Sequence, residues 1–249
     1  MFLTKTGLAL LLFFTILAAG PAEASLIVFG DSYSDAGTSG HGVHQAIHAA
    51  LTTVQLDVGT YPLAPYREGR CSNGLVWTEI AAANLGLELE SFATANAGSG
   101  AVPTQLYIPA PFGGQITEGE FQIPNTLQQA QAYLALKAGV IMPADIVLIF
   151  IGTNDYMFSQ PPGNYTQPPI TQVITAIIQT MDLCYHAGAR RFVLVNVPPL
   201  WTLPALPGPN PFGPNTTVQD EALSNAWFEQ CVPGHNAALA GVAAGYAKL

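Results

Sequence analysis

The amino-acid sequence predicts an α/β domain built on a parallel sheet, and three observations support this. Apolar runs with strand character alternate along the chain with segments of helical period, which is typical of strands joined by crossover helices. Two of these runs end directly in polar turns that contain glycine, at residues 30–32 and 152–155. The 249 residues suffice for one such domain after a leader is removed, without a second domain.

The first segment is expected to be a secretion signal. Lys5 precedes an apolar run over residues 8–17, and residues 22–24 supply the small side chains of a cleavage site. That run is too short for a transmembrane helix, which needs about 20 residues, and no later run reaches that length uninterrupted, so we expect no transmembrane segment. We therefore expect residues 1–24 to be a signal peptide, Ser25 to begin the mature domain of residues 25–249, and the protein to be secreted.

The strands and helices of the domain follow in alternation. Strands are identified by short apolar runs, and helices by apolar side chains that recur every three to four residues. Gly188 is placed where it can end the helix before the last strand. The expected strands are residues 26–29, 89–93, 146–151 and 192–197, and the expected helices are residues 76–85, 126–138 and 170–186.

The last part of the chain contains a proline-rich loop and one more helix. The loop at residues 198–214 is either a stiff connector or, because it follows a strand end, a wall of an acyl-binding cleft. A helix after the fourth strand should lead to a fifth, so we expect the last strand to be missing and the domain to be C-terminally incomplete. The final helix is expected to place on one face Leu239, Val242, Ala243, Tyr246 and Leu249.

Composition excludes some partners. Charged residues make up 9% of the chain and the formal net charge is −9, which argues against nucleic acid as a partner. The cysteines, Cys71, Cys184 and Cys231, are odd in number, so one is either buried and free or without its partner. Asn164 and Asn215 head Asn-x-Thr acceptor sites, which in an exported chain predict a glycoprotein.

The two polar turns carry the candidate chemistry. The strand 26–29 runs into Gly30-Asp31-Ser32, and a turn at the carboxyl end of a strand projects its side chains into the crevice where α/β sheets bind ligands. A serine there indicates nucleophilic catalysis, with backbone N–H groups facing the developing negative charge. The second turn contributes Asn154, whose alternative role is to close the turn through its own side chain.

Ordered motifs along the mature chain resemble those of the GDSL esterases and lipases of the SGNH hydrolase superfamily. The likeness covers nearly all of the mature chain in the family's order, which is more specific than any one motif. The motifs lie at residues 29–37, with Gly30-Asp31-Ser32, at 69–77, at 97–101, with Gly98-Ser99-Gly100, at 152–156, with Gly152-Thr153-Asn154-Asp155, at 191–200, and at 235–239.

The resemblance implies a flavodoxin-like α/β/α sandwich of three layers that hydrolyses esters through a serine nucleophile. Ser32 would be that nucleophile. The oxyanion hole would be the N–H of Ser32, a glycine N–H and the Asn154 side chain. Gly100 is the favoured glycine, and Gly98 stays open because Ser99 stands where the family has its middle glycine. Asp31 and Asp35 would support the turn.

The resemblance implies no metal or organic cofactor. The ester substrate, whether a small molecule, a lipid or a polysaccharide, is not decided by the sequence, and neither is the oligomeric state. His41, His44 and His48 could share a metal on one helical face, but a solvated segment after the nucleophile turn is the preferred interpretation.

The chain departs from the family at the catalytic base. The family supplies it from a late Asp-x-x-His motif, and none of the five histidines has an acidic residue three places before it. Asp182 stands four places before His186, where a surface pair within one helix is expected. The leading hypothesis is a secreted GDSL-type carboxylic-ester hydrolase that is inactive or weak in this form. The alternative is a catalytically silent carbohydrate- or lipid-binding protein.

Overall fold

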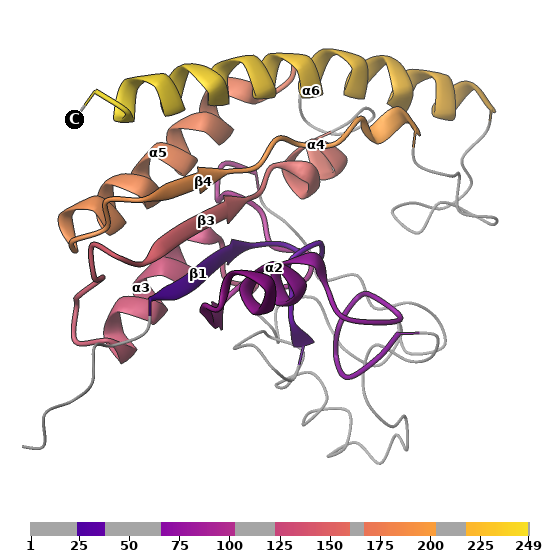
Figure 1. Ribbon diagram of the computed structural model, residues 1–249. Helices are drawn as coiled ribbons and strands as arrows, with labels where there is room; N and C mark the ends of the chain where they lie inside the picture. Colours follow the sequence, from indigo (N-terminus) through magenta and orange to yellow (C-terminus); the bar gives the residue numbers. More distant parts are fainter. Residues whose placement is uncertain (1–23, 38–65, 103–122, 160–166, 203–217, 249) are drawn as a thin grey trace, which may run out of the picture.

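The computed structural model describes residues 24–37, 66–102, 123–159, 167–202 and 218–248. They form a parallel sheet between helices, as the alternation in the sequence predicts (Figure 1). Several predicted features lie outside the described residues: the signal peptide before residue 24, the histidines at 41–48, both glycosylation sites, and most of the proline-rich loop. Within the described part, no helix is both long and apolar enough to cross a membrane.

The sheet has the strand order β2-β1-β3-β4, with every neighbouring pair parallel. This is the order of the first four strands of a flavodoxin-like sheet. In such a sheet the strand order reverses between β1 and β3, and ligands bind beyond the carboxyl ends of these two strands. Leu26 to Gly30 of β1 align with Ile146 to Phe150 of β3. The strands are β1 (Ser25–Gly30), β2 (Glu88–Ser91), β3 (Ile146–Phe150) and β4 (Phe192–Leu194).

Helices cover both faces of this sheet, which gives the expected three layers (Figure 1). Alternate side chains of a strand point to opposite faces, so Ile27 and Phe29 pack with α3, α5 and α6, whereas Leu26 and Val28 pack on the side of α2. The helices are α2 (Trp77–Leu85), α3 (Thr126–Leu136), α4 (Thr153–Ser159), α5 (Ile170–His186) and α6 (Val218–Tyr246), with a short 3₁₀ turn, η2 (Leu200–Thr202).

The structure differs from the sequence prediction in three elements. The fourth strand ends at Leu194 instead of residue 197, although the N–H of Val195 still donates to Ile149. Residues 153–159 form the helix α4, which the sequence analysis interpreted only as a turn. On α6, Leu239 is buried and Val242 is half-buried, but Ala243 is exposed. The helix packs along one edge, so the stripe of side chains that it buries is narrower than we expected.

The strand β4 forms one edge of the described sheet, and no further strand pairs with it among the described residues. Beyond β4 the chain is held by a side chain instead. The N–H of Val197 donates to Oδ1 of Asn236 at 2.9 Å, and Nδ2 of Asn236 donates to the Val197 carbonyl at 3.0 Å. One amide on α6 therefore satisfies both backbone groups that a neighbouring strand would otherwise pair.

Candidate active site

The candidate nucleophile lies in the turn that follows β1. The N–H of Ser34 donates to the Asp31 carbonyl at 3.0 Å, which closes the turn and leaves the Ser32 side chain half-exposed between them. No described residue bonds to the Ser32 hydroxyl or accepts its N–H. Neither group of Ser32 is therefore committed to a described residue.

A buried glutamine fixes the residue from which this turn starts. Oε1 of Gln129 accepts the N–H of Gly30 at 2.8 Å, and its Nε2 donates to the Gly30 carbonyl at 2.9 Å. Gln129 comes from α3 and is almost fully buried. The sequence analysis missed it, because only its polarity on an otherwise apolar helix face marks it.

The two aspartates of the motif support the turn in different ways. Asp35 accepts the N–H of Gly37 at 2.9 Å and that of Ala95 at 2.8 Å, so it ties the turn to the segment after β2. Asp31 accepts the N–H of Tyr33 at 3.1 Å through Oδ1, while its buried Oδ2 has no partner among the described residues. Burial raises the pKa of Asp31 to about 7.

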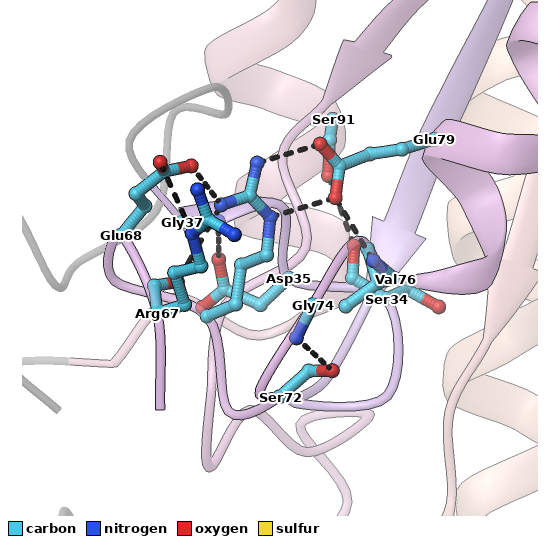
Figure 2. Close-up of polar contacts among 11 residues, drawn as sticks. Ser34, Asp35, Gly37, Arg67, Glu68, Ser72, Gly74, Val76, Glu79 and Ser91 are labelled. Atoms are coloured by element: carbon cyan, nitrogen blue, oxygen red, sulfur yellow. Dashed lines mark hydrogen bonds and ion pairs between the residues drawn. The ribbon is translucent and has the colours of Figure 1, made fainter. Parts of the chain in front are cut away.

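A buried arginine braces the loop that packs on this turn (Figure 2). The Arg70 guanidinium makes two bonds of 2.7 Å to the carboxylate of Glu79 and a third of 2.7 Å to Glu68. Figure 2 shows Glu68 beside Gly37, and Glu79 on the opposite side of the view beside Ser91 and Val76. Gly37 has φ of +60°, and a Cβ there would lie 2.2 Å from the Glu68 carbonyl oxygen, so only glycine permits this close packing.

The segment 94–99 brings the second turn to the first. Asn154 lies in the first turn of α4, and its Nδ2 donates to the Ala97 carbonyl at 2.8 Å. Because Asp35 binds Ala95 two residues earlier, one short segment holds both the nucleophile turn and Asn154. The Asn154 amide uses one hydrogen for this bond, and no described residue accepts the other.

Both candidate glycines remain available as donors. Gly98 is buried and Gly100 is exposed with φ of +102°, and no described residue accepts the N–H of either. Ser99 between them holds Asp155: its N–H donates to Oδ2 at 2.8 Å and its hydroxyl to Oδ1 at 2.7 Å. Burial raises the pKa of Asp155 to about 6. The sequence showed only that Ser99 replaces a glycine, not that it binds Asp155.

Comparison with known proteins identifies the family of this chain. The pattern of the family described as GDSL-like Lipase/Acylhydrolase matches residues 26–241, which is most of the chain. The chain belongs to this family. Relatives of this GDSL protein include proteins named acetylesterase and GDSL esterase/lipase.

Individual relatives of this GDSL protein are distant. It is 30% identical to an acetylesterase of Hypocrea jecorina, with 69% of the chain and 47% of that protein covered. It is 27% identical to a phosphatidylcholine-sterol acyltransferase of Aeromonas hydrophila, over 74% of the chain and 48% of that protein. An inactive GDSL esterase/lipase-like protein of Arabidopsis thaliana is 28% identical, with 73% of the chain and 43% of that protein covered. The chain spans about half the length of these relatives.

Two histidines lie among the described residues of this GDSL protein. His186 is exposed at the end of α5, which leads into the amino end of β4, so it lies at the edge of the sheet opposite Ser32. Its Nδ1 bonds the Asp182 carbonyl at 2.7 Å, and the Asp182 carboxylate accepts the Tyr246 hydroxyl, so no described bond joins the two side chains as the surface pair requires.

His235 lies on α6 at the carboxyl edge of the sheet, near the residues that follow β3 and β4. It is fully buried, and its Nδ1 bonds the hydroxyl of Tyr156 at 2.8 Å. No acidic side chain bonds either described histidine, so the Asp-His pair of the family does not form among the described residues.

The cysteines are all free thiols. Cys184 and Cys231 are buried in the core that packs α5 and α6 on the sheet. Burial raises the pKa of each of the three thiols to about 12, so they are protonated and poor nucleophiles at neutral pH. Within the described ranges, no cluster of three histidine, cysteine or acidic side chains could hold a metal ion.

Proposed function

We propose that this chain is the hydrolase domain of a secreted carboxylic-ester hydrolase that uses Ser32 as its nucleophile. The observation that carries the proposal is the double attachment of segment 94–99, to Asp35 at Ala95 and to Asn154 at Ala97. This attachment brings the turn of Ser32, the side-chain amide of Asn154 and two glycine N–H groups that no described residue accepts to one end of the sheet.

The proposed chemistry is acyl transfer. The Ser32 oxygen attacks the ester carbonyl, the alcohol leaves with a proton, and water then hydrolyses the acyl-serine. The intermediate places a negative charge on the former carbonyl oxygen, and the proposed donors are the N–H of Ser32, the N–H of Gly100 or Gly98, and Nδ2 of Asn154. Loss of one such donor costs on the order of 3 kcal/mol in the transition state.

The proposed mechanism requires a general base, and this is the group that the chain supplies least well. A serine hydroxyl is a poor nucleophile unless a neighbouring group removes its proton. Asp-x-x-His does not occur in the sequence, and His235 is buried with its Nδ1 committed to Tyr156. We therefore propose weak activity for this chain, which a preorganised oxyanion hole alone sustains at roughly 10³ to 10⁴ over the reaction in water.

The proposed substrates are acyl esters, and their alcohol portion is left open among small molecules, lipids and polysaccharides. An acetylesterase and a phosphatidylcholine-sterol acyltransferase are both relatives. The substrates that these two names indicate differ in acyl length and in acceptor, but both are esters that react at the carbonyl carbon.

The test combines hydrolysis of p-nitrophenyl acetate with fluorophosphonate labelling, for the chain and for Ser32→Ala. We expect slow turnover and slow labelling that both disappear in Ser32→Ala. Free imidazole can replace a missing base, so it should raise the turnover of the chain above the rate that imidazole gives with Ser32→Ala. Fast turnover without imidazole that depends on Ser32 would instead show that the chain already holds a base.

A catalytically silent binding protein is the second candidate. The named inactive relative and the burial of His235 favour it. This candidate predicts no turnover and no labelling that depends on Ser32, with or without imidazole. Such a result would remove the esterase proposal.

A further inference from the structure

Helix α6 contacts the segment that carries Asn154 through one buried histidine. Nδ1 of His235 lies 2.8 Å from the hydroxyl of Tyr156, which is two residues after Asn154 in α4. Both rings are fully buried, and they meet edge to face at 5.6 Å between centroids. A hydrogen bond between two buried groups holds its geometry tightly, because neither partner can exchange it for water.

The same imidazole also fills the space beside Gly152, two residues before Asn154. A Cβ built on Gly152 would lie 2.9 Å from Cε1 of His235 and 3.1 Å from Cγ2 of Val197. The backbone of Gly152 has φ of +122°, which side chains other than hydrogen rarely allow. His235 therefore contacts the segment on both sides of Asn154.

Three further contacts hold α6 in the position that brings His235 against Tyr156 and Gly152. Nε1 of Trp227 donates to the Tyr156 carbonyl at 3.2 Å, and Asn236 makes its two bonds to Val197. Gly234 allows the approach to α5, since a Cβ there would lie 2.6 Å from Cδ1 of Ile170. The helix is thus attached to α4, to the end of the sheet and to α5 within ten residues of its length.

The opposite side of the segment is held by residues 97–99. Asn154 donates to Ala97, and Asp155 accepts both the hydroxyl and the N–H of Ser99. With His235 behind and residues 97–99 in front, the first turn of α4 has contacts on two sides. Removal of the His235 contact should let the first turn of α4 shift and should loosen the hydrogen bond from Asn154 to Ala97.

We propose that His235 is a positioning residue, which fixes the Asn154 side-chain amide through Tyr156 and Gly152. The role of this amide as an oxyanion donor rests on the proposed function. His235 itself touches no substrate in this assignment. Its buried Nε2 has no hydrogen-bond partner among the residues that the structure describes, and burial lowers the pKa of the ring to about 4, so a neutral ring sits in this position at neutral pH.

The first test observes Asn154 directly and needs no enzymatic activity. In the full chain labelled with ¹⁵N-asparagine, loss of one signal in Asn154→Asp assigns its side-chain amide. We expect Tyr156→Phe and His235→Leu to speed hydrogen exchange of that amide at least about tenfold. His235→Asn keeps a polar atom near the position of Nδ1 and should restore slow exchange. His186→Leu, which changes an exposed histidine, is the control and should leave the exchange unchanged.

The second test measures ester turnover of the same variants, wherever Ser32-dependent turnover is detectable. A positioning role predicts a loss of about tenfold or more in kcat for Tyr156→Phe and His235→Leu, with KM changed less than twofold. If faster exchange appears without any Ser32-dependent turnover, the positioning role stands and only the proposed function fails.

Unchanged exchange of the Asn154 amide in Tyr156→Phe would overturn the assignment, whatever the turnover. This variant lacks only a hydroxyl, so it keeps the test valid if His235→Leu does not fold. Equal loss of kcat in His235→Asn and His235→Leu, with exchange unchanged in both, would also contradict a positioning role.

Discussion

At the scale of single residues, the ionised form of Asp31 is costly to bury, and this residue lies beside the candidate nucleophile, Ser32. Its carboxyl group is almost fully buried, one oxygen has no partner among the described residues, and the charges of Asp155 and Asp35 add to the effect of burial. These causes raise its pKa from 3.8 to about 7. The protonated form is therefore the one that the fold favours at mildly acidic pH.

We predict that Asp31→Asn reduces the loss of stability between about pH 4 and pH 7. In that interval the unfolded Asp31 has already lost its proton, whereas the folded one retains it, so the stability of the protein falls as pH rises. Asparagine cannot ionise and still offers an oxygen to the Tyr33 N–H. The stability of the variant relative to the original chain should grow by on the order of 3 kcal/mol across the interval.

Urea unfolding at a series of pH values measures this difference. The buried His235 acts with the opposite sign, because its pKa falls to about 4 and its neutral form is the folded one. The contribution of His235 is the same in the Asp31→Asn variant and in the original chain, so it cancels in the difference between their free energies of unfolding. Parallel curves of unfolding free energy against pH would show that Asp31 does not titrate as described.

At the scale of elements, the contact between Ser99 and α4 determines how the second motif meets the third. The Ser99 hydroxyl donates to Asp155 at 2.7 Å and also accepts the Ala101 N–H at 3.1 Å. A glycine at this place would keep only the backbone bond to Asp155. The substitution at the family's middle glycine is thus tied to the acidic residue that follows Asn154.

We predict that Ser99→Ala destabilises the protein by about 1–3 kcal/mol, because a buried carboxylate loses a hydrogen bond. The bond from the hydroxyl also lowers the pKa of Asp155 against the effect of burial, so its loss should raise that pKa further above about 6. The destabilisation should therefore be larger at pH 7 than at pH 5, where Asp155 is mostly protonated.

A matched control is Ser34→Ala. The Ser34 hydroxyl is also buried, but it has no hydrogen-bond partner among the described residues. Its removal should cost little and show no such pH dependence. Equal costs for the two variants at both pH values, measured by thermal or chemical unfolding, would contradict a specific role of the bond from Ser99 to Asp155.

At the scale of the whole molecule, the start of β1 is linked to the expected removal of the leader. The backbone nitrogen of Ser25 donates to Oδ1 of the buried Asp145 at 2.9 Å, and Oδ2 of Asp145 accepts the Met142 N–H at 2.9 Å. Cleavage after Ala24 would turn this nitrogen into an ammonium group. A hydrogen bond would then become an ion pair at the edge of the sheet opposite Ser32.

We predict that secreted protein begins at Ser25 and that Asp145→Asn costs about 1–3 kcal/mol more in this form than in one with extra residues before Ser25. N-terminal mass spectrometry identifies the first residue, and unfolding of both forms, with and without the substitution, gives the difference. An intact Met1 in secreted material would refute the signal peptide. Equal costs in the two forms would refute the ion pair.

The sequence by itself determined the parts of this protein that depend on local patterns. Apolar runs and helical periods identified four strands and four of the main helices, because burial on both faces of a parallel sheet leaves near-continuous apolar strands. The turn at Ser32, the position of Asn154 just after a strand and the resemblance to the GDSL family were also evident from the sequence, and the family is confirmed. It also showed that the Asp-x-x-His motif is absent.

Only the tertiary structure decided which distant residues meet. Gln129 on Gly30, Ser99 on Asp155 and His235 on Tyr156 join residues far apart in the sequence, and no spacing rule predicts such pairs. The helix α4 and the short β4 were also set by packing, since propensity over seven or fewer residues is too weak to define an element. The sequence therefore proposed the chemical groups of the candidate site, and the packing of α3, α4 and α6 on one sheet decided how they are held.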